Sequence, residues 1–319
     1  MNAITTDTRF KNIESLINKY PIEDIDTSKI KKIKEAYQEY TPKYSIINKT
    51  LKIRDSEFYD VSILYEINTF KNYIFINEPL IDIKIVYKNK PSDKLINKIY
   101  SIVRLFQKLY ENKKVVVTIA LSSSKRILTA PIIKSVNVNG GQTDLDQIEV
   151  FREEEVLKVL MHELCHYFKL DCGDINKKQE PLMNKFNIKT PTYLSVQEAF
   201  TEYLAMLHHI AIISHYTNIA IKLIYHYEKM WSLYQVCKIL NHYKMKKFGD
   251  LKNKKMVQGT NVFSYYIIKF FILYTMDNKC SVTNLSNILD NKKIINMIDE
   301  NMNMKFDKCM RMTLFDLLV

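Results

Sequence analysis

Residues 162–166, His-Glu-Leu-Cys-His, place two imidazoles and one carboxylate at a spacing that suits metal chemistry. His162 and His166 are four positions apart, so on a helix both side chains lie on one face and can reach one metal ion. Glu163 is rotated by about 100° from His162, so it can reach a water molecule at the metal without binding the metal itself. The pattern predicts a zinc site with His162 and His166 as ligands and Glu163 as general base.

The flanking residues predict a helix over residues 151–171 that would carry this motif. Its apolar residues recur at helical spacing and would form one buried stripe: Val156, Leu157, Leu160, Leu164, Tyr167 and Phe168. Glu153–Glu155 would place negative charge in the first turn, where the helix dipole favours it, and Gly173 is suited to end the helix. The alternative is that two histidines and a glutamate merely share a helix.

A catalytic zinc site usually has three protein ligands and one open position, so the chain must supply a third ligand. Glu198 and Glu202 are four positions apart in a predicted helix over residues 194–213. We expect Glu198 to bind the metal and Glu202, one turn later, to accept the outer N–H of a ligand histidine. Asp171 is expected to end the first helix or to support a histidine in the same way.

With these residues the chain resembles the gluzincin metallopeptidases, the thermolysin and zinc-aminopeptidase type. In that family the third ligand is the glutamate of an Asn-Glu-[Gly/Ala]-[Phe/Ile] motif, which residues 197–200, Gln-Glu-Ala-Phe, match with Gln in place of Asn. Glu202 matches the acidic residue that supports a histidine ligand, although the 31 residues between His166 and Glu198 are more than thermolysin-type enzymes have. The resemblance implies a zinc-dependent peptidase with a zincin-like α+β fold, in which an N-terminal sheet and the active-site helix precede a mostly helical subdomain.

Other third ligands fit the sequence less well. In metzincins a His or Asp falls six residues after the second histidine and a Gly three residues after it, and these positions hold Cys172 and Lys169. Without the glycine we do not expect the helix to turn back sharply, which argues against Cys172 as a ligand. His208 and His209 follow Glu198 by about three turns and are expected to be core or surface histidines.

Peptide hydrolysis also requires a hydrogen-bond donor for the developing oxyanion. Gluzincins recruit a Tyr or His from the helical subdomain, and Tyr265 and Tyr266, near the start of a predicted helix, are the candidates. The alternatives are three histidines of the same half: His215, His226 and His242. The chain has no GxMEN-like sequence upstream, the element with which aminopeptidases of this class hold a free amino terminus, so an endopeptidase or a carboxypeptidase is favoured.

Strands are expected before the motif and helices after it. The elements predicted before it are two short helices in residues 7–40 separated at Pro21, strands at 72–88, 114–122 and 127–139, and a helix at 91–113. The further helices predicted after it lie at 217–247, 261–277, 282–298 and 306–318. We divide the chain into an N-terminal extension (1–70), a sheet subdomain with the motif (71–172) and a helical subdomain with the third ligand (173–319).

The end of the last predicted strand is a candidate site for a peptide. Ser135–Asn139 with Gly140-Gly141 would form the edge of the sheet above the cleft, where a peptide substrate could add through backbone hydrogen bonds. The alternative is an ordinary hairpin strand.

Composition limits the partners and the location. The formal net charge is +12, but 41 Lys stand against 6 Arg, whereas proteins that read bases or phosphates favour Arg. Nucleic acid is therefore not an expected partner. The expected partner is a peptide or protein substrate; the charge is expected to be spread over solvated faces, and a preference for acidic substrates is the alternative.

The sequence predicts neither a signal peptide nor a membrane-spanning segment. The N-terminus is polar and no apolar run approaches the length of a bilayer span, which predicts a cytoplasmic protein without membrane contact. Five Cys without a CxxC pair make a disulfide framework unexpected. The heavy use of Ile, Asn, Lys and Tyr is similar to that of large DNA viruses with AT-rich genomes, which would place the protein in a host cell or a virion.

Two other functional classes stay open. One is a structural or interaction protein with a non-catalytic zinc site, and the other is a basic, nucleic-acid-associated protein in which the motif is a chance match. Metal analysis separates the last class from the others, and loss of hydrolysis in Glu163→Gln with zinc retained separates the first two.

Overall fold

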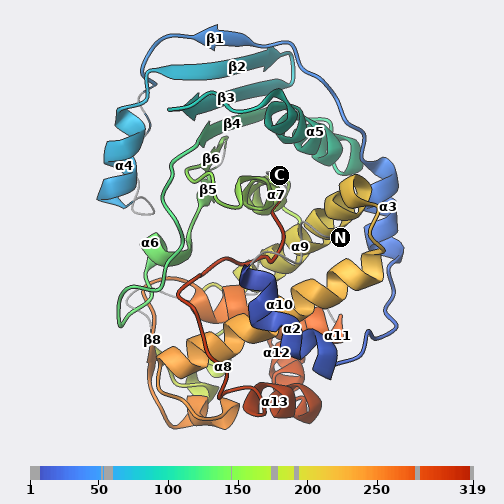
Figure 1. Cartoon of the computed structure of the whole chain (residues 1–319), viewed down its shortest axis with the longest axis vertical. Coiled ribbons are helices and arrows are strands. Elements are labelled where there is room, and N and C mark those ends of the chain that lie inside the picture. Colours follow the sequence, from blue (N-terminus) through green and yellow to red (C-terminus); the bar gives the residue numbers. More distant parts are fainter. Residues whose placement is uncertain are drawn as a thin grey trace.

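The computed structural model of the chain describes residues 8–51, 53, 60–144, 146–173, 179–189, 194–276 and 281–316. A six-stranded sheet lies at one end, at the top of Figure 1, and helices fill the other end. The strand order across the sheet is β1-β2-β3-β4-β6-β5. The strands are β1 Ser45–Ile47, β2 Asn72–Glu78, β3 Ile81–Tyr87, β4 Val115–Ala120, β5 Gly141–Thr143 and β6 Ile148–Val150. The fold is therefore mixed α and β, consistent with the expected α+β class.

The two faces of the sheet have different covers. Strands β3, β4 and β6 are parallel, and the outer pairs β1–β2, β2–β3 and β6–β5 are antiparallel. Along β3, Ile83 and Ile85 face the main core, which helices α5 (Asp93–Leu109) and α7 (Val156–Tyr167) also line. Val86 points to the opposite face, into a smaller core with residues of helix α4 (Val61–Asn68). This alternation is the period of two that a strand imposes on its side chains.

The prediction of one strand over residues 72–88 is wrong in one respect. The segment forms a hairpin in which β2 and β3 pair along their full length, with Glu78 opposite Ile81. Pro79 and Leu80 make the two-residue turn between them. A proline that cannot donate to a ladder is well placed in such a turn.

The prediction of a strand over residues 127–139 is wrong. Ile127 makes one isolated bridge, with Cys309, and residues Ser135–Val138 form a single helical turn, α6. The Asn137 side chain stabilises this turn, because it accepts from the Lys134 N–H and donates to the Ile127 carbonyl. The sheet ends at β1 on one side and at β5 on the other, so the edge predicted at Ser135–Asn139 lies instead at residues 141–143.

The helical half begins after α7. Its helices are α8 Glu180–Lys185, α9 Gln197–Thr217, α10 Ile221–His242, η2 Phe248–Lys252, η3 Phe263–Ile268, α11 Lys269–Thr275, α12 Val282–Ile288 and α13 Lys292–Asp299. A short parallel pair, β7 Ile188–Lys189 and β8 Met256–Val257, lies among them. The helix predicted at 282–298 is two helices, because Asn291 caps the start of α13.

The N-terminal helices pack on both parts of the molecule. The predicted pair before and after Pro21 is confirmed as α2 (Thr8–Lys19) and α3 (Ser28–Ala36). Helix α2 packs on α10, α3 packs on α9 and α5, and β1 joins the sheet. Helix α7 lies between the halves, in contact with α5, β5, β6 and α9 (Figure 1).

The helix predicted at 306–318 is wrong over the residues that the structure describes, which end at 316. Residues 310–315 are irregular and buried. Their backbone groups bond to side chains of other elements: Thr313 N–H donates to Glu155, and Leu314 N–H donates to Glu228. These tertiary partners replace the i to i−4 bonds that would satisfy the backbone in a helix.

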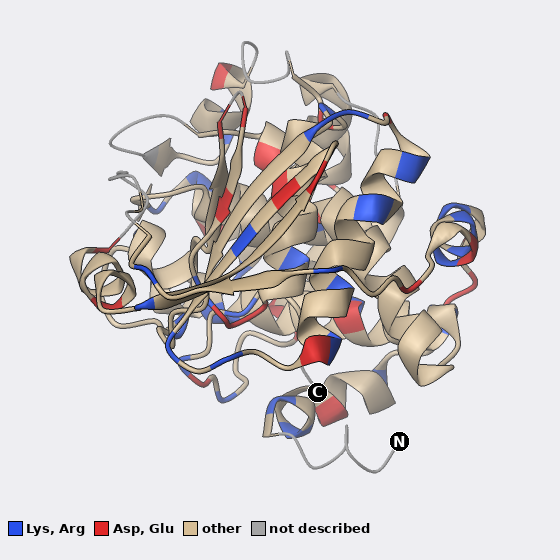
Figure 2. Ribbon diagram, turned by 90° about the horizontal axis from the view of Figure 1, so that it is seen from above, with Lys and Arg blue, Asp and Glu red and all other residues tan. Residues whose placement is uncertain are grey.

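Charged residues of both signs are spread over the helices and strands (Figure 2). Figure 2 shows Lys and Arg close to Asp and Glu in the helices and strands seen from above. In the described part of the chain, no helix combines the length and the apolar character needed to cross a membrane.

Candidate metal centre

Helix α7 begins later and ends earlier than predicted. It starts at Val156, so Glu154 and Glu155 precede its first turn instead of forming it. Both are buried acceptors: Glu155 pairs with the Arg126 guanidinium at 2.5 Å, and Glu154 accepts from the Arg126 N–H. The predicted role of these acids in the helix dipole is therefore wrong.

The C-terminal end of α7 turns back without a glycine. Lys169 adopts the left-handed conformation, with φ of 52°, and the Leu170 N–H bonds to the Cys165 carbonyl at 2.9 Å. These contacts form a Schellman-type end. Two expectations are corrected: the helix stops before Gly173, and the sharp turn expected to require glycine forms with lysine. The turn brings Asp171 back to His166.

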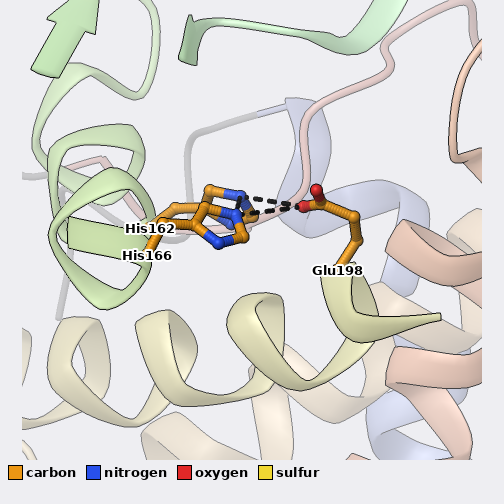
Figure 3. Close-up of side chains that lie close together, drawn as sticks. All are labelled: His162, His166 and Glu198. Atoms are coloured by element: carbon orange, nitrogen blue, oxygen red, sulfur yellow. Dashed lines mark hydrogen bonds and ion pairs between the residues drawn. The ribbon is translucent and has the colours of Figure 1, made fainter. Parts of the chain in front are cut away.

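Three side chains from two helices meet at one point (Figure 3). His162 and His166 extend from α7, and Glu198 extends from the first turn of α9. The two histidine Nε2 atoms are 3.1 Å apart, and Glu198 Oε2 lies 3.2 Å from His162 Nε2 and 3.3 Å from His166 Nε2. The three predicted ligands are thus brought together, and within the described residues they form the only such cluster of metal-binding groups.

The size of this triangle fits a small divalent ion. A tetrahedral ion about 2.0–2.1 Å from each donor requires donor atoms about 3.3 Å apart. The observed separations of 3.1–3.3 Å are close to that value. Two imidazole nitrogens and one carboxylate oxygen, with the fourth direction left to the cleft, are a donor set typical of catalytic zinc.

Each histidine has its own carboxylate on the outer nitrogen. Glu202 Oε1 lies 2.8 Å from His162 Nδ1, and Asp171 Oδ2 lies 2.5 Å from His166 Nδ1. A carboxylate on Nδ1 favours the tautomer whose Nε2 is free to bind a metal. Asp171 is hydrogen-bonded to His166 in this way, whereas Glu202 approaches His162 Nδ1 as an ion-pair partner without hydrogen-bond alignment. Burial opposes the charged form of both rings, but Glu202 and Glu198 raise the net pKa of His162, and Glu198 and Asp171 raise that of His166.

Glu202 also binds a buried lysine. The Lys158 ammonium, one turn before His162 on α7, pairs with Glu202 Oε2. Burial raises the pKa of Glu202, but Lys158 and His162 outweigh it and the net pKa is lowered. Glu202 therefore stays charged between a lysine and a ligand histidine.

The Glu163 side chain contacts the edge strand β5. Its side chain is buried, and the Thr143 hydroxyl donates to Glu163 Oε2 at 2.8 Å. The other oxygen, Oε1, lies so close to Gly141 that a Cβ there would be 2.8 Å from it. Burial raises the pKa of Glu163, although His162 and His166 oppose this. A carboxylate with a raised pKa beside a metal site is suited to accept a proton.

The structure separates the two candidate tyrosines. Tyr265 lies in η3, a π-helical turn, with its ring centroid 6.2 Å from that of His162. Burial, Glu198 and Glu163 raise the pKa of Tyr265 well above its usual value, so its hydroxyl stays protonated. Tyr266 points elsewhere and donates to the Met310 carbonyl at 2.6 Å. Tyr265 is therefore the donor candidate that remains.

The other histidines and Cys172 lie outside the triangle. His208 and His209 are buried in the core, as expected. The three alternative donors also lie elsewhere: His215 packs on Tyr37, His226 packs on Tyr227, and His242 contacts the Pro131 carbonyl. Cys172 is disulfide-bonded, contrary to the expectation of unpaired cysteines, and this leaves no thiolate for a metal.

A cleft of about 790 Å³ opens onto the three donors. Strand β5, the second half of α7 and the start of α9 form its walls, and Glu163 and Tyr265 line it together with the histidines. A side pocket of about 30 Å³ continues toward the N-terminal end of α7. The edge strand and the donors therefore share one cleft.

Three residues of the site were missed from the sequence. Lys158 could have been found, because it lies four positions before His162 and so on the same helix face. Thr143 and Arg126 reach the site from a strand and a loop, and no local spacing indicates them.

Comparisons with known proteins do not assign the chain to a family. No protein-family model, curated protein or solved structure matches the chain. The geometry of the site is therefore the basis for a functional proposal.

Proposed function

We propose that the protein is a zinc-dependent peptidase of the gluzincin type, with a zincin-like fold. The observation that carries the proposal is the triangle of His162 Nε2, His166 Nε2 and Glu198 Oε2, with sides of 3.1–3.3 Å. The carboxylates behind both histidines support it, since a purely structural pair of histidines does not need them.

His162, His166 and Glu198 would hold the zinc. When bound, zinc would polarise the scissile carbonyl and lower the pKa of a water molecule. Glu163 would accept the proton of the attacking water and pass it to the leaving amine. Its carboxylate is held for this task by Thr143 on the edge strand.

Tyr265 would donate a hydrogen bond to the oxyanion. Its hydroxyl stays protonated because burial and the nearby carboxylates raise its pKa. A donor that is already in place costs no reorganisation during the reaction. The absence of a GxMEN-like sequence favours an endopeptidase or a carboxypeptidase over an aminopeptidase.

Glu163→Gln tests the proposal. The variant should bind about one zinc per chain, as the wild type does, but should lose hydrolysis of a peptide library, because an amide cannot accept the proton. Zinc is measured by elemental analysis and cleavage by mass spectrometry. Wild-type protein that binds zinc but cleaves no peptide would indicate a non-catalytic zinc protein, and protein without zinc would contradict the proposal altogether.

A further inference from the structure

The side pocket next to the metal centre contains an arginine with unused hydrogen-bonding capacity. The pocket is lined by Arg126, Gly140, Gly141, Val159 and Met312 in addition to His162, Glu163 and Tyr265. Arg126 is only 2% exposed. A buried guanidinium normally bonds through all of its N–H groups.

Arg126 uses three of its five N–H groups on protein acceptors. Its Nε donates to the Val138 carbonyl at 2.7 Å, and Nη1 donates to the Glu154 carbonyl and to Glu155 Oε2. The two N–H groups of Nη2 bond to none of the described residues. Nη2 lies against Gly140, where a Cβ would come within 2.2 Å of it. Gly140 thus makes room for this nitrogen in the wall of the pocket.

Among the described residues, Lys158 and Glu202 also line the pocket and pair with each other, so Arg126 is the cation of the pocket that keeps free N–H groups. Glu155 is shared, because it also accepts from the Thr313 N–H at 2.7 Å and lies 3.8 Å from Arg311 Nε. The negative charge of Glu155 is therefore divided among Arg126, Arg311 and the Thr313 N–H, and it does not fully neutralise Arg126.

The size of the pocket limits what could bind there. Its volume is about 30 Å³, and one water molecule needs roughly 10–15 Å³ of such space. The pocket therefore has room for two or three non-hydrogen atoms, the number in a carboxylate group. A carboxylate oxygen is also a charged acceptor for a free N–H of Nη2, and charge-assisted hydrogen bonds are the stronger ones.

We propose that this pocket binds a carboxylate of the substrate, carried by the residue whose amine leaves on cleavage. The inference rests on the proposed peptidase function. It places the carboxylate on the leaving side because Glu163, which would pass the proton to the leaving amine, lines the same pocket. The carboxylate is either an Asp or Glu side chain or the free C-terminus of the substrate.

Peptides that differ at one position test the proposal on the zinc-loaded enzyme. In a cleaved parent peptide, the residue after the cleaved bond is replaced by Asp, Asn, Glu, Gln or Ala. A second set ends at that residue, as a free acid or as an amide. We expect kcat/KM to be at least about tenfold higher for a carboxylate than for the matching amide, because charge-assisted bonds are the stronger ones. Faster cleavage of the Asp or Glu peptide than of its Asn or Gln counterpart would show that the pocket binds a side-chain carboxylate. Faster cleavage of the free acid than of the amide would show that it binds the C-terminus of the substrate.

Binding to Glu163→Gln gives a readout that is independent of turnover. Isothermal titration of the zinc-loaded variant with the Asp and Asn peptides, and with the free-acid and amide pair, should show the same preference. Equal affinities within both pairs would overturn the proposal and leave the pocket as a site for bound water only.

Two variants and one control assign the preference to Arg126. Arg126→Lys keeps a cation beside Glu155 but has no second terminal nitrogen, and Arg126→Met with Glu155→Gln removes both charges together. Each should reduce the carboxylate preference to about twofold or less, a loss comparable to that of one charge-assisted bond. In the control, Arg152→Lys, the preference should persist, because Arg152 bonds through all three of its nitrogens to the Asn139, Val136 and Lys125 carbonyls and to Ser124.

The outcomes distinguish this inference from the proposed function. Protein without zinc, or without cleavage of any peptide, contradicts the proposed function and the inference with it. Cleavage without any carboxylate preference overturns the inference alone. A preference that survives in both Arg126 variants, with thermal unfolding confirming that they fold, also overturns it.

Discussion

Two pairs of histidines lie on the neighbouring helices α7 and α9, and only the pair on α7 belongs to the candidate metal centre. His162 and His166 on α7 direct Nε2 atoms at one another and at Glu198. His208 and His209 on α9 are at least as deeply buried, at 0% and 1% exposure. His162 is 7% exposed and His166 is only partly buried, so the deepest burial belongs to the core pair and does not by itself indicate a candidate metal ligand.

The partners of the rings make the difference. His208 Nδ1 bonds to the Leu204 carbonyl and its Nε2 to the Tyr110 hydroxyl, so both nitrogens have neutral partners. His209 contacts the Thr313 hydroxyl. Burial lowers the pKa of His208 to about 4 and that of His209 to about 3. On α7 burial also opposes the charged form, but the neighbouring carboxylates outweigh it, so the pKa values of His162 and His166 are raised.

This comparison teaches that neighbouring carboxylates distinguish the candidate metal-binding pair from the core pair. A carboxylate on Nδ1 selects the tautomer with a free Nε2, and a carboxylate on the Nε2 side completes a donor set. The core pair has neither arrangement, so it remains neutral and satisfied by neutral groups.

The largest expected effect is the loss of a ligand histidine. His162→Ala should lose zinc, because two protein ligands remain, with an affinity loss greater than about 100-fold. His208→Ala should keep about one zinc per chain while lowering the free energy of unfolding, because it only creates a cavity. Zinc content after dialysis against a chelator measures both. Loss of zinc from His208→Ala in folded protein would remove the distinction between the pairs.

The next effect compares the two supporting carboxylates. Glu202→Gln and Asp171→Asn should each reduce zinc affinity by roughly 10–100-fold, and less than Glu198→Gln does. Glu202→Gln should also reduce the free energy of unfolding by about 3–5 kcal/mol, because it leaves the Lys158 charge buried and unpaired. Asp171→Asn leaves no buried lysine without a partner, so it should lower the free energy of unfolding by less. Chelator competition and urea unfolding separate the two effects; equal stabilities of the two variants would contradict the role assigned to Lys158.

A smaller effect concerns the glutamate between the ligand histidines. Thr143→Val removes the hydroxyl that holds Glu163, and kcat should fall by roughly 10-fold, the cost of about one hydrogen bond to a charged group. Thr143→Ser keeps the hydroxyl and should retain most of the activity. Zinc content should not change in either variant. Equal kcat values for the Val and Ser variants would show that the hydroxyl does not position the base.

The smallest effect is a pH dependence of stability due to the core pair. The folded pKa of His208, about 4, lies below the unfolded value of about 6.5, so the unfolded state binds the proton first. The stability contributed by neutral His208 is therefore present above pH 6.5 and is lost as the pH falls toward 4. Between pH 7 and pH 5.5 the loss should be about 1 kcal/mol.

Replacement of this histidine tests the sign. His208→Gln does not titrate in this range, so the free energy of unfolding should fall less between pH 7 and pH 5.5 than it does in the wild type. Urea unfolding of both proteins at the two pH values gives the difference. A variant with an unchanged pH dependence would show that His208 is not held neutral.

The sequence by itself determined the parts of the site that depend on spacing along a helix. His162, Glu163 and His166 lie on α7, and Glu198 and Glu202 lie one turn apart on α9, because a period of 3.6 residues is a local property. The strand at β4 and the helix at α5 follow from local patterns in the same way.

Only the tertiary structure decided how these elements meet. Residues 310–315 looked helical, but their backbone groups bond to Glu155, Glu228 and Trp231 from distant elements. Thr143 reaches Glu163 across 20 positions, and Lys158 reaches Glu202 across 44. Such contacts depend on the packing of whole helices and strands, and the short-range pattern of a sequence contains no record of that packing. The same reason explains why Tyr265 lines the cleft at the candidate metal centre and its neighbour Tyr266 does not.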